Sequence, residues 1–270
     1  PPSAENVDLE KNAPIISHPD VKRMLMLMRS LTEGSRALCY LTAVNFDLGH
    51  GAASEGSEAA LARAELLTPI AKAWSTEVSQ EVTSLGVQVH GGMGYIEETG
   101  AAQLMRDARI TTIYEGTTGI QANDFIGRKV YRDGGRELAR LLADAEVTLD
   151  GMAALCELDD VYVALKRAML ELGQVTQWLL DRGTDDALLA GTASFNYLMG
   201  AGTCISGWLL AKSAMISLAK VDEDPEFYRS KITTCRFFAA HILPRSASYF
   251  AAVKTSNDPS LLLPEDAFGH

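Results

Sequence analysis

One glutamate in the chain stands where a carboxylate could act as a base. Glu115 lies in the segment IYEGT (113–117), with apolar and aromatic neighbours on one side and glycine on the other. Such a setting can hold a carboxylate in a partly dry turn, and desolvation raises the pKa of a carboxyl group towards that of a useful base, whereas a helix dipole opposes this rise. The alternative is a capping acid at the start of a helix over residues 117–132. The residues alone leave both roles open.

A glycine-rich stretch, GGMGY over residues 91–95, is the second candidate. Glycine has no Cβ, so the backbone can approach a ligand closely and its N–H groups can bind phosphate oxygens. The dinucleotide fingerprint GxGxxG is not met, and no strand pattern precedes the stretch. Taken alone, the stretch is explained more simply as a helix C-cap followed by a tight turn.

The histidines and cysteines do not predict a metal site. A di-iron site in a helical bundle needs Glu-x-x-His motifs on facing helices. None of the five histidines follows a glutamate at that spacing, and DLGH (47–50) is the nearest approach. The cysteines form no CxxC pair, which argues against zinc and disulfides and fits a reducing compartment. They lie far apart in the chain, at Cys39, Cys156, Cys204 and Cys235.

Apolar residues recur at three- and four-residue steps along most of the chain, as in amphipathic helices. Thr68-Pro69 falls within one predicted helix, either as a kink or as an N-cap followed by proline. Strand signals are nearly absent, so the predicted class is all-α: an up-and-down four-helix bundle followed by a second helical domain. The predicted helices cover about residues 21–49, 58–90, 101–109, 117–132, 135–155, 158–182, 185–220 and 225–256.

Composition changes predict three regions. Residues 1–19 contain four prolines and read as an irregular arm, which we expect to be a loop of a longer parent protein. Residues 20–133 form the predicted bundle, and the break at Asp133-Gly134-Gly135 separates it from the predicted additional domain, residues 134–270.

The charge of the chain excludes some partners. Lys and Arg total 24 and Asp and Glu total 35, for a formal net charge of −11. The negative electrostatic field of such a chain repels phosphate groups, which argues against nonspecific binding of nucleic acid or anionic membranes. The sequence has no run of about 18 uncharged apolar residues and no signal-peptide pattern at its start, so we expect no membrane span and a cytoplasmic location.

Residues 88–121 carry a more specific signal. The stretch QVHGGMGYIEETGAAQLMRDARITTIYEGTTGIQ joins both candidates at a fixed spacing and resembles the C-terminal signature of the acyl-CoA dehydrogenases. The helices before it resemble the C-terminal four-helix domain of that family. The helical tail after Gly135 resembles the longer branch, which includes methylthiopropanoyl-CoA dehydrogenase and broad-specificity bacterial enzymes.

The resemblance implies the α,β-dehydrogenation of an acyl-CoA thioester with FAD as cofactor. Glu115 would take the α-proton while the β-carbon gives a hydride to flavin N5, and a backbone N–H at Glu115 would help to stabilise the thioester oxygen. Tyr114 and Gly116 would contact the acyl-CoA. The residues implied to bind the FAD diphosphate are Thr117 and, across a subunit interface, Gln88, Gly91 and Gly92.

The chain also departs from the family pattern. Gly119 stands where many members have glutamine, and Pro19 where a flavin-contacting glutamine often lies. The family's N-terminal helical domain and β-domain are missing, so we expect the chain alone to bind FAD weakly and to be inactive. The implied partners are those missing domains, an electron-transfer flavoprotein and a second copy in a homodimer. The alternatives are a flavin-fold relative with a binding or DNA-repair-associated role, which would need a more basic surface, and a plain helical interaction module.

Overall fold

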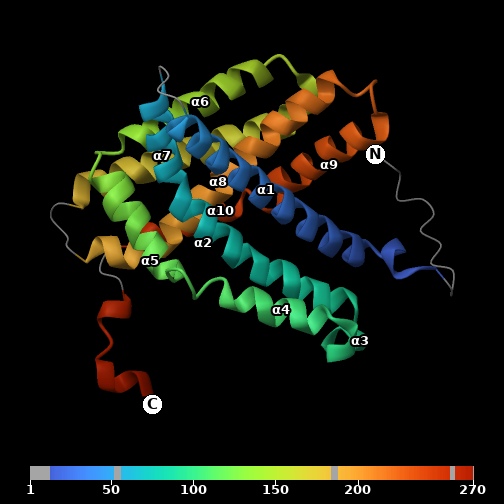
Figure 1. The fold of residues 1–270 in the computed structure, drawn as a ribbon, viewed down its shortest axis with the longest axis horizontal. Helices are drawn as coiled ribbons and strands as arrows, with labels where there is room; N and C mark the ends of the chain where they lie inside the picture. Colours follow the sequence, from blue (N-terminus) through green and yellow to red (C-terminus); the bar gives the residue numbers. More distant parts are fainter. Residues whose placement is uncertain (1–12, 52–55, 184–187, 256–258, 270) are drawn as a thin grey trace.

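The computed structural model describes residues 13–51, 56–183, 188–255 and 259–269. Most of these residues are helical and none lies in a strand, which confirms the predicted all-α class (Figure 1). Most of the predicted arm lies outside the described residues, and its last part contains a short 3₁₀ turn, Ile15–Ser17. The main helices are α1 (Pro19–His50), α2 (Ser57–Val89), α3 (Gly92–Tyr95), α4 (Ala101–Ile110), α5 (Thr118–Asn123), a π-helical segment (Asp124–Tyr131), α6 (Arg136–Met152), α7 (Asp159–Arg182), α8 (Leu189–Ala219), α9 (Pro225–His241) and α10 (Arg245–Val253).

Two details of the helix prediction are settled by the structure. Pro69 lies inside the uninterrupted helix α2, so the N-cap alternative at this position is wrong. The single helix predicted over 225–256 is also wrong, because the chain turns between α9 and α10 at residues 242–244. Ile242 and Leu243 are buried in that turn and continue the apolar period of α9, which hides the break from a periodicity argument.

Helix α8 is the centre of the molecule. It is apolar on most sides and contacts α1, α2, α5, α7, α9 and α10, as expected for a helix that is hydrophobic all round (Figure 1). The Trp74 ring of α2 packs on Gly202, where an added Cβ would lie 2.4 Å from the ring. The indole Nε1 of Trp74 also donates to Thr203 Oγ1 at 3.1 Å. These contacts fix the middle of α2 on the core.

The two predicted helical regions share one hydrophobic core, because buried residues from α1 to α10 form a single cluster. Polar contacts also join the regions. Arg63 of α2 donates to Glu137 Oε1 at 2.6 Å and to Asp144 Oδ2 at 2.8 Å, both on α6. The domain boundary at residues 133–135 stays a prediction.

Candidate functional site

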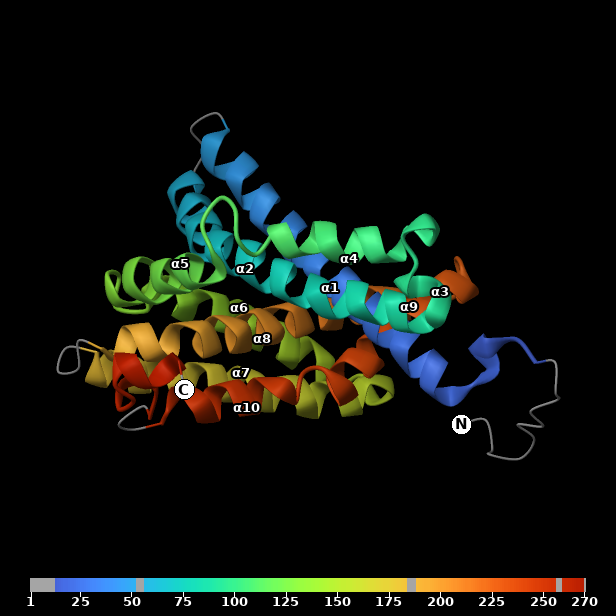
Figure 2. The same cartoon turned by 90° about the horizontal axis from the view of Figure 1, so that it is seen from below.

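The candidate base lies in the turn between α4 and α5, which we call the Glu115 turn (residues 111–117). Figure 2 shows this segment next to α2, between the ends of α4 and α5. Four predicted site residues come together here: Tyr114, Glu115, Gly116 and Thr117. The substrate and base candidates are therefore neighbours in space as well as in sequence.

The backbone of the Glu115 turn is strained. Glu115 has φ +52° and is the one non-glycine residue with positive φ among the described residues. Gly116 follows with φ +89°. A left-handed conformation costs an L-residue about 1–2 kcal/mol, and strain of this kind concentrates at functional sites. A glutamate stands where glycine would adopt the backbone conformation more easily, which points to a use for its side chain.

The side chains of Glu115, Ile113 and Tyr114 are exposed, with Ile113 at 48% and Tyr114 at 51%. The described residues therefore do not supply the partly dry setting that the sequence suggested. Within the described part of the chain, neither the carboxylate nor the backbone N–H of Glu115 makes a hydrogen bond. Both groups are therefore available to another molecule or another part of the protein.

Glu115 does not cap helix α5. The N-cap is Thr117, whose Oγ1 accepts a hydrogen bond from Ile120 N at 3.3 Å. The hydroxyl proton of this exposed threonine has no acceptor among the described residues, so it can donate to a ligand. The capping alternative for Glu115 is therefore wrong.

Helix α2 holds the Glu115 turn with polar side chains that the sequence analysis missed. Lys72 Nζ donates to the Gly116 carbonyl at 2.5 Å. Glu77 Oε1 accepts the hydroxyl of Thr118 at 2.6 Å. Gln80 Nε2 donates to the Ala108 carbonyl at 2.8 Å and holds the end of α4. On an amphipathic helix these residues read as solvent-facing, and no local pattern in the sequence identifies them as contacts.

The glycine-rich stretch has the cap predicted from its residues. Gly91 follows the C-cap of α2 with φ +60°, and both Gly91 and Gly92 are exposed with open space where a Cβ would stand. Gln88 is exposed beside them. Gly94 is different, because an added Cβ would lie 2.2 Å from the Val87 carbonyl oxygen. Gly94 is thus required by packing, whereas Gly91 and Gly92 leave room for a ligand.

The structure does not bring the two candidate groups together. Gln88, Gly91 and Gly92 lie where α2 ends and α3 begins, and α3 contacts α4 near its start, whereas the Glu115 turn follows the end of α4 (Figure 2). The ten residues of α4 span about 15 Å. On one chain the two groups therefore lie too far apart to contact the same phosphate group.

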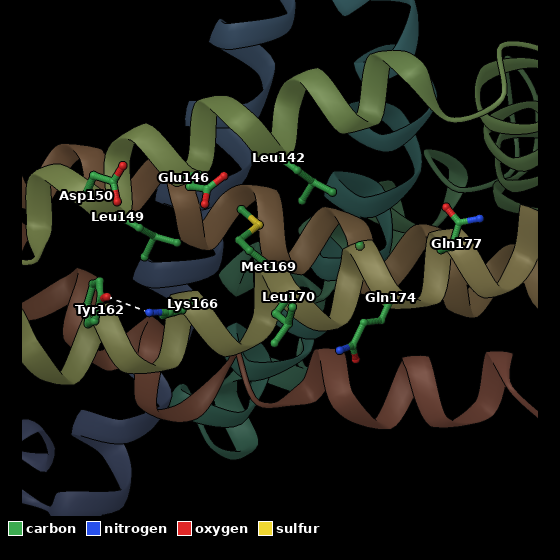
Figure 3. A pocket seen from close by; sticks show the side chains of 11 residues that line it. Leu142, Glu146, Leu149, Asp150, Tyr162, Lys166, Met169, Leu170, Gln174 and Gln177 are labelled. Atoms are coloured by element: carbon green, nitrogen blue, oxygen red, sulfur yellow. Dashed lines mark hydrogen bonds between the residues drawn. The ribbon is translucent and has the colours of Figure 1, made fainter.

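A separate groove runs between α6 and α7, and none of its lining residues is a predicted site residue (Figure 3). Its volume is about 540 Å³, and leucine and methionine side chains form its floor. Glu146 and Asp150 lie along α6, and Lys166 of α7 donates to Tyr162 Oη at 3.1 Å. In the described part of the chain no cluster of His, Cys, Asp and Glu suited to a metal ion is found.

Two family models match the chain and together cover most of it. The model described as "Acyl-CoA dehydrogenase, C-terminal domain" matches residues 6–131, which include the Glu115 turn. The model described as "Acetyl-CoA dehydrogenase C-terminal like" matches residues 137–264. The chain belongs to the acyl-CoA dehydrogenase family. It represents the C-terminal helical part of that family, as residues 88–121 suggested.

Curated relatives agree with this assignment. The chain is 43% identical over 253 residues to 3-methylmercaptopropionyl-CoA dehydrogenase of Ruegeria pomeroyi, covering 92% of this chain and 43% of the relative. It is 32% identical over 275 residues to the broad-specificity linear acyl-CoA dehydrogenase FadE5 of Mycobacterium tuberculosis, covering 96% of this chain and 45% of the relative. The chain thus spans less than half the length of these dehydrogenases.

A solved structure shares the fold. The crystal structure of an acyl-CoA dehydrogenase complexed with FAD from Bacillus anthracis matches with a TM-score of 0.72 at 18% identity. The match covers 94% of this chain and 45% of that one. Both helical regions of this chain are therefore part of one arrangement that a solved structure also contains.

Proposed function

We propose that this chain is the C-terminal part of an FAD-dependent acyl-CoA dehydrogenase, with Glu115 as the base that removes the α-proton of an acyl-CoA. The observation that carries the proposal is the exposed, left-handed Glu115, whose carboxylate and N–H have no hydrogen-bond partner among the described residues. Family membership and the names of the matched dehydrogenases support the reaction class.

Proton removal from the α-carbon needs a carboxylate with a pKa near the working pH. Glu115 presents an exposed carboxylate, and a bound thioester together with the rest of the enzyme would exclude water from it. The neighbouring Tyr114, half exposed on the same turn, would line the acyl chain and contribute to the exclusion of water.

Charge that develops on the thioester oxygen needs a hydrogen-bond donor. The N–H of Glu115 is available for this purpose in the described structure. Removing one such donor costs about 100- to 1000-fold in kcat in other enzymes. Base and donor would thus come from one residue, so the conformation of the Glu115 backbone sets the position of both.

When bound, FAD would accept the hydride of the β-carbon at its N5 atom. The residues fit the diphosphate of such a cofactor: the free hydroxyl proton of Thr117 can donate to a phosphate oxygen, and Gly91 and Gly92 let a phosphate approach the backbone. Because α4 separates Thr117 from the glycines, we propose that the glycines and Gln88 serve the cofactor of a second copy, in a homo-oligomer for which a dimer is the simplest form.

The relatives are more than twice as long as this chain. We propose that a preceding helical domain and a β-domain complete the flavin and CoA site, so the chain alone should bind FAD weakly and turn over nothing. None of the described helices is long and apolar enough to cross a membrane. A cytoplasmic location and an electron-transfer flavoprotein as electron acceptor complete the proposal.

The reaction is tested with the full-length protein that contains this chain. The purified protein is mixed anaerobically with acyl-CoAs of different chain length and branching, and the visible absorbance of the flavin is followed. Bleaching by at least one acyl-CoA supports dehydrogenation, and the best substrate identifies the acyl class. Bound flavin that no acyl-CoA reduces would contradict the proposal and favour a relative with a binding role.

A further inference from the structure

The Glu115 turn is held in an unfavourable conformation although it lies at the surface. Two successive left-handed residues, Glu115 and Gly116, form its centre. The Glu115 side chain makes no hydrogen bond or ion pair in the described part of the chain that would hold it there. A strained residue persists only when its surroundings determine it, so other contacts must fix this turn.

Lys72 makes the shortest contact to the turn. Its side chain is half buried, and its ammonium nitrogen lies 2.5 Å from the Gly116 carbonyl oxygen, immediately after the candidate base. A hydrogen bond from a charged donor is short and about twice as strong as a neutral one. Gln121 adds a weaker bond from Nε2 to the Glu115 carbonyl at 3.3 Å. Both carbonyls of the strained pair are therefore held by side chains.

Helix α2 is a firm support for this contact. Trp74, two residues after Lys72, is 1% exposed and packs on α8. Further along α2, Glu81 accepts two hydrogen bonds from Arg245 of α10, at 2.6 and 3.0 Å. Glu77 of the same helix accepts the Thr118 hydroxyl just after the turn. The position of Lys72 is thus fixed by the core and not by the loop that it contacts.

We propose that Lys72 is a positioning residue: through the Gly116 carbonyl it holds Glu115 in the left-handed conformation from which its carboxylate and N–H both reach the substrate. This inference rests on the proposed function. The competing explanation is that Lys72 only adds to the stability of the fold, and the experiment must separate the two.

The test replaces Lys72 by methionine, which keeps an unbranched apolar side chain out to Cε and removes the ammonium donor. The matched control is Lys129→Met. Lys129 is also half buried, and its Nζ lies 3.1 Å from Glu65 Oε2, but in the described part of the chain no hydrogen bond or ion pair joins it to the Glu115 turn. Both variants are made in the full-length protein.

The first measurement is hydrogen exchange of the backbone amides in the peptide covering residues 111–121, without substrate. Loss of a charged hydrogen bond predicts that Lys72→Met speeds this exchange by roughly 10- to 100-fold, while Lys129→Met leaves it at the wild-type rate. Equal exchange in wild type and Lys72→Met would overturn the proposal. So would a uniform increase across α1, α2 and α8, because that result means general destabilisation.

The second measurement is steady-state kinetics with the best acyl-CoA. A displaced base lowers kcat, and we expect a loss of roughly tenfold or more with KM nearly unchanged, because the interaction matters mainly in the transition state. A variant with wild-type kcat would overturn the positioning role even if its exchange were faster. If no form of the enzyme, wild type included, oxidises an acyl-CoA, the proposed function fails and the positioning role fails with it, while the exchange result still reports whether Lys72 holds the turn.

Discussion

The strain at Glu115 predicts that a glycine at this position makes the chain more stable. In the left-handed conformation at φ +52°, an L-residue is disfavoured by about 1–2 kcal/mol, which Glu115→Gly removes. The greater freedom of glycine in the unfolded chain offsets about 0.5–1 kcal/mol of this gain. The carboxylate has no partner in the described part of the chain, so no stabilising contact is lost. The net expectation is a gain of up to about 1.5 kcal/mol, with a middle value of ~0.75 kcal/mol.

The assay is urea unfolding of the 270-residue chain, with the midpoint and the slope m fitted for each variant. Glu115→Gly should raise the midpoint at constant m. The control, Glu115→Ala, removes the carboxylate and keeps the strain, so it should not be more stable than wild type. A second control, Gly116→Ala, adds strain at φ +89° and should destabilise by about 1–2 kcal/mol.

The reasoning is refuted if Glu115→Ala is as stable as Glu115→Gly, or if Glu115→Gly is less stable than wild type. Either result would mean that the turn holds no strain for glycine to release. The expected result has a functional counterpart, since Glu115→Gly in the full-length enzyme should be more stable and inactive. A residue that costs stability and is needed for activity is typical of a catalytic position.

Three further predictions concern the framework. Gly94→Ala places a Cβ against the Val87 carbonyl and should lower the free energy of unfolding by about 2 kcal/mol, measured by urea titration. Arg63→Met leaves the buried Glu137 carboxylate without its closest donor and should cost about 2 kcal/mol in the same assay, whereas a cost near zero would contradict the role of this pair. Burial raises the pKa of the Cys235 thiol to about 12 from 9.0. The folded chain therefore keeps this thiol protonated where the unfolded chain loses the proton. The stabilisation linked to the protonated thiol is complete below pH 9 and is lost between pH 9 and 12, as the unfolded thiol ionises. Near pH 10 the free energy of unfolding should fall with pH less steeply in Cys235→Ala than in wild type, by about 1.4 kcal/mol per pH unit.

The helices could be predicted from the sequence because their apolar periods are regular. Most predicted ends agree with the structure to within a few residues, as for α2 and α7. The turn before α10 could not be found in this way, because Ile242 and Leu243 keep the apolar pattern through it. Periodicity records which residues are buried and not whether the backbone between them is helical.

Only some features of the candidate site could be predicted from the sequence. Glu115, Gly91 and Thr117 were singled out by residue type and by the family resemblance, which fixes their spacing. The left-handed conformation of Glu115 and its bond network could not be predicted, because a backbone dihedral angle and a contact 44 residues apart in sequence, such as Lys72 to Gly116, leave no local pattern. The separation of the two candidate groups by α4 also depends on the fold.

The central claim is that the carboxylate of Glu115 removes the α-proton, and one comparison tests it most directly. The full-length enzyme, Glu115→Gln and the control Glu98→Gln, which changes another exposed glutamate of the same motif, are mixed anaerobically with the best acyl-CoA, with and without deuterium at its α-carbon. Flavin reduction is followed in a stopped-flow instrument. The account predicts rapid reduction with an α-deuterium isotope effect in wild type and Glu98→Gln, and loss of reduction by at least about 100-fold in Glu115→Gln, which still binds FAD. Reduction of the flavin at the wild-type rate in Glu115→Gln would contradict the account.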